Sequence, residues 1–168
     1  MKKGGKFTPE MLARMKQAKG TGIEPIPMVW KDINNKKIII VMGTRPEIIK
    51  LWPIIECFKV KNIKPIIVYT GQHKSLASQM FETFDIKPDY YLSVMVGHQS
   101  ISELNARLLK KLDLVFFVEK PDLVIVQGDT ASALNGAMAS FFHRIPIAHI
   151  EAGLRSQDLA HPFPEEFN

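Results

Sequence analysis

Residue types suited to chemistry gather in four short segments of this 168-residue chain. The segments are Gly43-Thr44-Arg45-Pro46-Glu47, Gly128-Asp129-Thr130, His149-Ile150-Glu151-Ala152-Gly153-Leu154-Arg155 and Pro162-Phe163-Pro164-Glu165-Glu166. Their carboxylates can take or give protons, and their basic side chains suit phosphate groups. Each of the first three follows a predicted strand. We therefore expect them at one edge of one sheet, where open α/β folds bind their ligands.

The segment around Arg45 suits an anion. It opens a predicted helix, whose start offers free N–H groups and the positive end of the helix dipole. Gly43 allows a tight turn and a close approach of a ligand, while Arg45 and Lys50 supply cations for phosphate. The alternative is structural: a helix cap formed by Thr44 and Glu47, beside a solvated arginine.

Two more carboxylates stand just beyond predicted strands. Asp129 is either the N-cap of the next helix or a base or acceptor at the ligand-binding edge. Glu151 is hard to explain as part of the core, because buried carboxylates are rare unless they are paired. If this segment is extended, His149 points to the same side as Glu151. Arg155 is then either the partner of Glu151 or a second phosphate ligand.

The last segment ends close to the final residue, Asn168. Its prolines predict a rigid loop that leads into a helix, in which Glu165 and Glu166 complement the helix dipole. Taken alone, this segment favours a structural role. Because the chain stops inside a segment of active-site character, we expect it to be the first half of an enzyme.

Hydrophobic periodicity predicts regular alternation of strands and helices. Strands are expected over residues 37–42, 65–70, 89–92, 122–127 and 146–150, and helices over 44–60, 75–84, 100–118 and 130–143. Such alternation predicts parallel pairing with right-handed crossovers. The uninterrupted apolar run of residues 38–41 indicates burial on both faces. We therefore predict a Rossmann-like α/β fold with helices on both faces of the sheet.

Residues 1–35 are predicted to be a basic extension and linker, and residues 36–168 the folded domain. The net charge is +5, but residues 1–37 hold 9 of the Lys and Arg residues against 3 acids. Because the rest is nearly balanced, we expect no nucleic-acid partner for the domain. The extension is either solvated or loosely docked, or it is an arm that binds a partner or nucleic acid.

The composition also indicates the cellular compartment of the protein. No apolar run approaches the roughly 20 residues that a membrane helix needs. The single cysteine, Cys57, cannot form an internal disulfide, which favours a reducing compartment. We therefore expect a cytoplasmic protein without a membrane partner. No spacing of Cys and His residues indicates a metal site.

The four segments, together with Gly71-Gln72-His73, resemble in order and spacing the non-hydrolysing UDP-N-acetylglucosamine 2-epimerases. The resemblance runs from about Lys36 to the last residue. It implies one half of a two-domain enzyme of the glycosyltransferase-B arrangement, with the active site between the domains and the C-terminal domain absent here. It further implies interconversion of UDP-GlcNAc and UDP-ManNAc, and a homodimer in the complete enzyme.

The resemblance also assigns roles to individual residues. Asp129, Glu151 and Glu165 match the catalytic carboxylates of the family. The substrate-binding residues are Gly43, Arg45 and Lys50, of which the two cations contact the diphosphate. Gln72 and His73 match contacts to a second, regulatory UDP-GlcNAc.

The reaction implied is elimination of UDP to give 2-acetamidoglucal, followed by re-addition from the other face. It needs a base, an acid and a phosphate clamp, and we expect a carboxylate whose pKa is raised by a dry cleft. It requires no metal or other cofactor. The alternatives are a hydrolysing relative that releases ManNAc and UDP, a non-catalytic module that binds nucleotide sugars, and a glycosyltransferase of the same architecture.

Overall fold

The computed structural model describes residues 33–71 and 74–166, so the expectations for residues 1–32 lie outside the described part. The compact unit that holds the described residues extends over Asp32–Asn168. Its elements are the short helix η2 (Ile33–Asn35), β1 (Ile38–Met42), α2 (Arg45–Val60), β2 (Ile66–Tyr69), α3 (Lys74–Thr83), β3 (Tyr90–Tyr91), α4 (Ile101–Glu119), β4 (Leu123–Gln127), α5 (Ala131–Phe142) and β5 (Ile147–Ile150). Every strand and helix expected between residues 37 and 150 is present.

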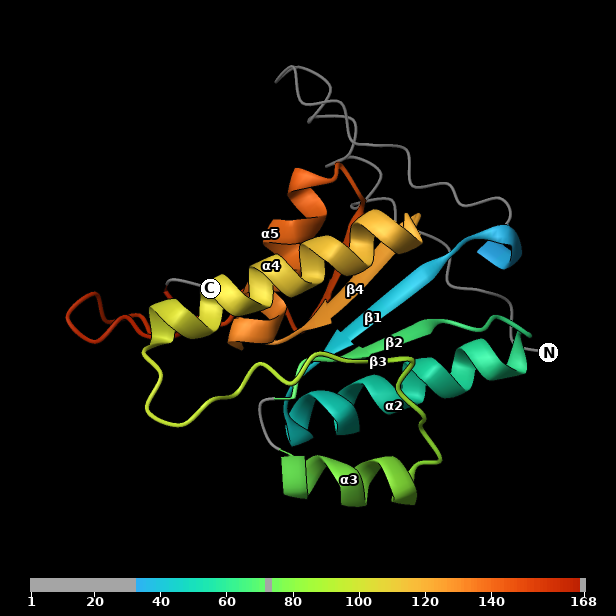
Figure 1. Cartoon of the computed structure of the whole chain (residues 1–168), viewed down its shortest axis with the longest axis horizontal. Coiled ribbons are helices and arrows are strands. Elements are labelled where there is room, and N and C mark those ends of the chain that lie inside the picture. Colours follow the sequence, from blue (N-terminus) through green and yellow to red (C-terminus); the bar gives the residue numbers. More distant parts are fainter. Residues whose placement is uncertain (1–32, 72–73, 167–168) are drawn as a thin grey trace, which may run out of the picture. The chain divides into compact units, whose positions relative to one another are not determined.

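The five strands form one parallel sheet in the order β3-β2-β1-β4-β5. Helices α2 and α3 cover one face, and α4 and α5 cover the other (Figure 1). The predicted Rossmann-like α/β fold is therefore confirmed. The strand order changes direction between β1 and β4, and open α/β sheets bind ligands in the crevice beyond such a switch point.

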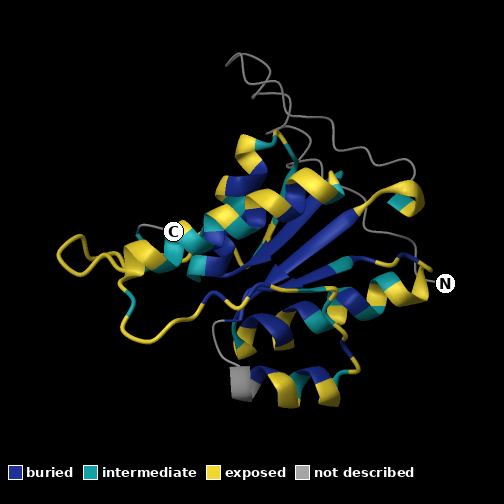
Figure 2. Ribbon diagram, viewed as in Figure 1, coloured by how far each residue is buried: buried dark blue, intermediate teal, exposed yellow. Residues whose placement is uncertain are grey.

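The core lies on both faces of the two central strands. All residues of β1 and β4 are buried (Figure 2). Helix α5 lies close to these strands because Gly136 has no side chain: a Cβ there would come within 2.9 Å of Val126 Cγ1. Phe116 and Leu112 of α4 fill the space beside α5 and are fully buried. The sheet edge is thus carried by a rigid, close-packed centre.

Two helices begin with the capping boxes that the sequence predicts. In α4, the Glu103 carboxylate accepts a hydrogen bond from the Ser100 N–H at 2.8 Å, and Ser100 Oγ accepts one from the Glu103 N–H at 3.2 Å. In α2, the corresponding pair is Thr44 and Glu47. These caps fix the first turn of each helix, and for α2 that turn lies at the carboxyl edge of the sheet.

Within the described part of the chain, no helix is long and apolar enough to span a membrane.

Candidate functional site

The carboxyl edge of the sheet holds most of the residues selected from the sequence. Arg45 begins α2 just beyond β1, Asp129 follows β4, and Glu151 follows β5 directly. Because these strands are parallel neighbours, their ends lie at the same edge. The structure therefore brings together segments that are about a hundred residues apart in sequence, as expected.

Glu151 lies beside Lys50 and Gln127. The Nζ of Lys50 and the Nε2 of Gln127 both donate to Oε2 of Glu151. The hydrogen bond from Lys50, more than that from Gln127, lowers the pKa of Glu151 below its usual value. Of the two alternatives for Arg155, the pairing with Glu151 is wrong, because Arg155 pairs with Glu166.

The backbone explains why Glu151 departs from strand geometry. Its φ is +56°, in the left-handed region, so side-chain alternation ends at Ile150. His149 instead turns its Nε2 toward the carbonyl oxygen of Gly128, at 2.6 Å. A carbonyl only accepts, so Nε2 of His149 carries the proton and donates. Left-handed backbone in a residue with a side chain is unfavourable, and such strain concentrates at functional sites.

A cavity of about 420 Å³ opens beside β4 and β5. Its walls include Asp129, His149, Arg155, Glu165 and Glu166. Two of the three predicted catalytic carboxylates therefore share one hollow, although they are far apart in sequence. Glu151 is not among the residues that line this cavity and lies instead beside Lys50.

Asp129 is half-buried at the wall of that cavity, and it does not cap α5. The N-cap is Thr130, whose Oγ1 accepts a hydrogen bond from the N–H of Ala133 at 3.1 Å. Gly128 adopts a φ of +71°, which lets the backbone turn sharply after β4. The structure thus excludes the N-cap interpretation of Asp129 and places this residue at the carboxyl edge of the sheet.

The loop after β5 is held by an ion pair between Arg155 and Glu166. Arg155 Nε donates to Glu166 Oε2 at 2.7 Å, and the Gln157 N–H donates to Glu166 Oε1 at 3.0 Å. These donors, Arg155 above all, lower the pKa of Glu166 to about 2. Residues 163–166 form a turn, so the described residues do not begin the helix expected there.

The lowered pKa of Glu166 predicts a loop that loosens in acid. Because the folded-state value lies below the unfolded one, the stabilisation is present above about pH 4.5 and is lost as the pH falls toward 2. In ¹³C NMR we expect the Glu166 carboxyl to titrate near pH 2, together with the Gln157 amide. Replacing Arg155 by Gln should move the midpoint toward 4. A midpoint near 4.5 in the unmodified chain would contradict this anchor.

The predicted anion site at the start of α2 is filled by the chain itself. The N–H groups of Gly43 and Thr44 donate to Oε2 of Glu47 at 3.0 and 2.6 Å, and Thr44 Oγ1 donates to the same atom at 2.7 Å. The two amides are therefore not free, and the structural alternative describes this turn correctly. Arg45 is exposed, so a ligand phosphate would depend on the side chains of Arg45 and Lys50.

Sequence reasoning missed Gln127 and Thr130. Gln127 is a buried amide at the end of an apolar strand, and it holds Glu151. Thr130 donates from Oγ1 to Oε1 of Glu47 at 2.8 Å. The polar residue that ends the apolar run of β4 was the available signal for Gln127. Gln72 and His73 lie outside the described residues, so the regulatory site remains a prediction.

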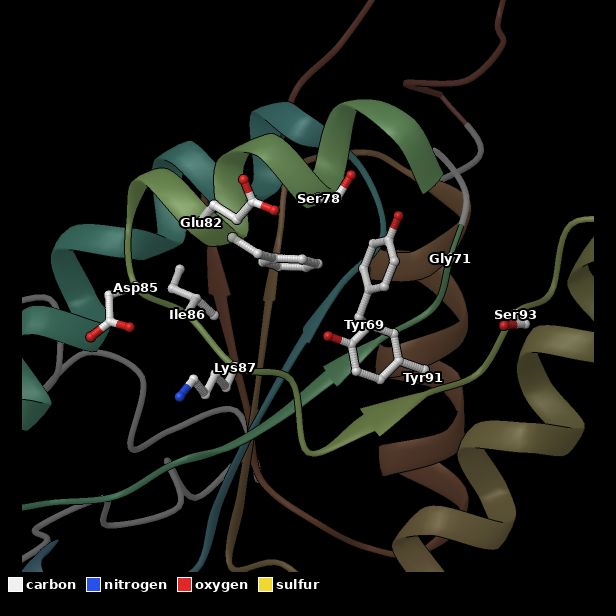
Figure 3. Close-up of a pocket in the computed structure, with 10 residues that line it drawn as sticks. Tyr69, Gly71, Ser78, Glu82, Asp85, Ile86, Lys87, Tyr91 and Ser93 are labelled. Atoms are coloured by element: carbon white, nitrogen blue, oxygen red, sulfur yellow. The ribbon is translucent and has the colours of Figure 1, made fainter.

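A second hollow, of about 600 Å³, lies between α3 and the strands β2 and β3. The Tyr69 ring meets Phe81 edge-on at 4.9 Å and Tyr91 at 6.0 Å, and Figure 3 shows the two tyrosines side by side in its wall. Gly71, which leads into Gln72, also lines this hollow. Among the residues that the structure describes, the two hollows have no lining residue in common.

Comparison with known proteins gives a consistent result. A family model described as UDP-N-acetylglucosamine 2-epimerase matches residues 56–168. The UDP-N-acetylglucosamine 2-epimerase of Bacillus subtilis is 41% identical over 133 residues, which are 79% of this chain and 35% of the relative.

Solved structures agree with the sequence match. The Staphylococcus aureus MnaA–UDP co-structure has 44% identity and a TM-score of 0.74, with 79% of this chain and 35% of the other covered. The Methanocaldococcus jannaschii UDP-GlcNAc 2-epimerase in complex with UDP-GlcNAc and UDP has 42% identity and a TM-score of 0.73, with 79% and 36% covered. The chain thus spans about a third of the length of these relatives. It belongs to the UDP-N-acetylglucosamine 2-epimerase family.

Proposed function

We propose that this chain supplies the N-terminal part of the active site of an enzyme that interconverts UDP-GlcNAc and UDP-ManNAc. The observation that carries the proposal is the gathering of Lys50, Asp129, Glu151 and Glu165 at the carboxyl edge of one parallel sheet. Relatives solved with UDP, or with UDP-GlcNAc and UDP, support the substrate class.

The proposed reaction is elimination followed by re-addition. A base removes the proton from C2 of the sugar, and the electron pair of the C2–H bond forms the C1–C2 double bond. The C1–O bond breaks at the same time, and its electron pair leaves with the β-phosphate oxygen of UDP. The intermediate, 2-acetamidoglucal, has a double bond between C1 and C2. An acid then delivers a proton to the opposite face of C2 as the UDP oxygen attacks C1. Atoms and charge balance without any co-reactant.

In this proposal, Lys50 links phosphate binding to the pKa of Glu151. Lys50 now donates to Glu151 and lowers its pKa, and both side chains are partly exposed. A diphosphate that draws Lys50 away would remove the largest cause of that lowering. Arrival of the substrate would therefore make Glu151 a stronger base where it is needed.

Epimerisation needs groups on both faces of C2. Asp129 and Glu165 line one cavity, whereas Glu151 is not among its lining residues and is held by Lys50. This separation suits proton removal on one face and delivery on the other. Arg45 and Lys50 would then stabilise the charge on the departing UDP.

A titration of the labelled chain with UDP tests the substrate-binding part of the proposal. We expect weak, saturable shifts of the backbone amides of Gly128 and Gly153 in ¹⁵N NMR spectra. Uridine, which lacks the diphosphate, is the control and should leave both amides unmoved. Absence of any UDP-dependent shift would contradict nucleotide binding by this chain.

A chimera tests turnover. Residues 36–168 of this chain replace the matching segment of the Bacillus subtilis relative, and the chimera is given UDP-GlcNAc. UDP-ManNAc as product supports the proposal. Free ManNAc and UDP would assign the hydrolysing reaction instead, and no product would contradict both.

We propose a cytoplasmic location, which nucleotide-sugar chemistry and the single cysteine support.

We propose a regulatory nucleotide-sugar site at Gln72 and His73. The test is whether the Gly71 amide shifts with a second affinity for UDP-GlcNAc. We also propose a homodimer; the exposed rings of Phe141 and Phe142 at the end of α5 support it, and sedimentation at rising concentration checks it.

A further inference from the structure

Glu47 is an ionisable side chain with no exposed surface that bridges two loops of the candidate site. Its Oε2 accepts from the N–H groups of Gly43 and Thr44 and from Thr44 Oγ1, and its Oε1 accepts from Thr130 Oγ1 at 2.8 Å. The first loop follows β1 and the second follows β4. These are the two strands between which the strand order reverses, so Glu47 joins both sides of the ligand-binding crevice.

Capping alone does not account for this arrangement. The other capping box, Ser100 and Glu103, does the same local work at the start of α4 with an exposed carboxylate and donors from one residue. Burial of a carboxylate is costly, and burial raises the pKa of Glu47 although its hydrogen bonds oppose the rise. The additional feature of Glu47 is the bond to Thr130, a residue 83 positions away.

We propose that Glu47 is a positioning residue that locks the Gly43–Thr44 turn to the Gly128–Thr130 turn. Arg45 follows Thr44 directly and Asp129 precedes Thr130, so the lock sets the spacing between a phosphate-binding cation and a catalytic carboxylate. This inference rests on the proposed function for its consequence, whereas the lock itself is a property of the fold. Small displacements of reacting groups have large effects on binding and rate, which gives the lock its importance.

The hydroxyl of Thr130 makes two hydrogen bonds, one as acceptor and one as donor. Its Oγ1 accepts from the N–H of Ala133 at 3.1 Å and donates to Glu47 at 2.8 Å, so one hydroxyl both caps α5 and ties it to α2. A hydroxyl has one proton to donate, and here it is donated in the hydrogen bond to Glu47. Substitutions at position 130 therefore keep or remove the two bonds together: Thr130→Ser keeps both, and Thr130→Val removes both at nearly constant volume.

The test uses the full chain with four variants at these two positions and one control. Glu47→Gln keeps the reach of the side chain, an acceptor oxygen for the Gly43 and Thr44 donors, and an amide that can donate to Thr130. Glu47→Ala removes all of these. The matched control is Glu103→Ala, which removes the exposed carboxylate of the other capping box.

We expect Glu47→Ala and Thr130→Val to weaken UDP binding at least tenfold and to speed exchange of the Thr44 amide at least tenfold. Glu47→Gln and Thr130→Ser should stay within threefold of the unmodified chain in both measurements. Glu103→Ala should lose thermal stability without weakening UDP binding. This pattern separates a positioning role from a purely structural one.

The outcomes are distinguishable. If Glu47→Ala does not fold, Thr130→Val gives the answer. UDP binding by Thr130→Val as tight as that of the unmodified chain would overturn the inference. If the unmodified chain binds no UDP, the proposed function fails, but the Thr44 amide still decides the lock: an unchanged exchange rate in Thr130→Val overturns it, and a tenfold faster one supports it.

Discussion

Glu151→Gln, introduced into the chimera with the Bacillus subtilis relative, is expected to lower kcat by about 10²–10⁴-fold, the range typical for loss of a general acid or base. Glutamine has nearly the same shape but neither takes up a proton nor carries charge. It can still accept hydrogen bonds from Lys50 and Gln127, which now hold the carboxylate. The loss should therefore appear in kcat, measured by production of UDP-ManNAc.

The fold should survive this change. The Glu151 side chain is 38% exposed and that of Lys50 is 47% exposed, and an ion pair this accessible contributes at most about 1 kcal/mol. Glu56→Gln is the matched control, because Glu56 pairs with Lys59 at 2.8 Å on the same helix and with similar exposure. The control should keep normal turnover and a normal melting temperature. Near-normal turnover by Glu151→Gln would remove the residue from the proposed mechanism.

Physical patterns in the sequence predict the architecture well because they are local. The apolar run of Ile38 to Val41 has no polar alternation, as expected for a strand covered on both faces, and the structure buries every one of these residues. The spacing of Thr44 and Glu47, and of Ser100 and Glu103, places both helix starts correctly. Once the strands and helices are predicted, the positions where the strands end are known as well. Those strand ends form the edge of the sheet where the candidate site lies.

Partners across the edge could not be predicted in the same way. Lys50 pairs with Glu151 from 101 positions away, whereas the nearer Arg155 pairs with Glu166. The reason is the left-handed backbone at Glu151, which turns its side chain away from the direction that strand alternation predicts. Left-handed backbone is usually predicted from a glycine, and position 151 holds a glutamate, so the sequence does not predict this turn.

The choice between Asp129 and Thr130 as N-cap shows the same limit. Both residue types cap helices well, and both stand where the helix is expected to begin. The structure gives the cap to Thr130, because the turn at Gly128 starts α5 one residue later than an Asp129 cap would allow. The bond between Thr130 and Glu47 joins the N-terminal ends of two helices that lie on opposite faces of the sheet (Figure 1), and neither local sequence pattern predicts it.

Phe116→Ala is expected to cost about 3–5 kcal/mol of unfolding free energy, the usual loss for a phenylalanine in a close-packed core. Phe116 is fully buried against the sheet, among residues such as Val124 and Ala139. A whole domain is stable by only about 5–15 kcal/mol, so this one change removes a large share. For a domain of this size the melting temperature should fall by roughly 10–20 °C, as followed by circular dichroism.

The neighbouring residue supplies the matched control. Phe117 is the same residue type on the same helix, but it is 67% exposed, and Phe117→Ala should change the free energy by no more than about 0.5 kcal/mol. Successive helical residues point about 100° apart, so the contrast between the two variants measures which face of α4 meets the sheet. Equal losses in both variants, or a larger loss at Phe117, would mean that α4 is rotated. A rotated α4 would no longer pack on α5, the helix that Thr130 caps and ties to Glu47 at the candidate site.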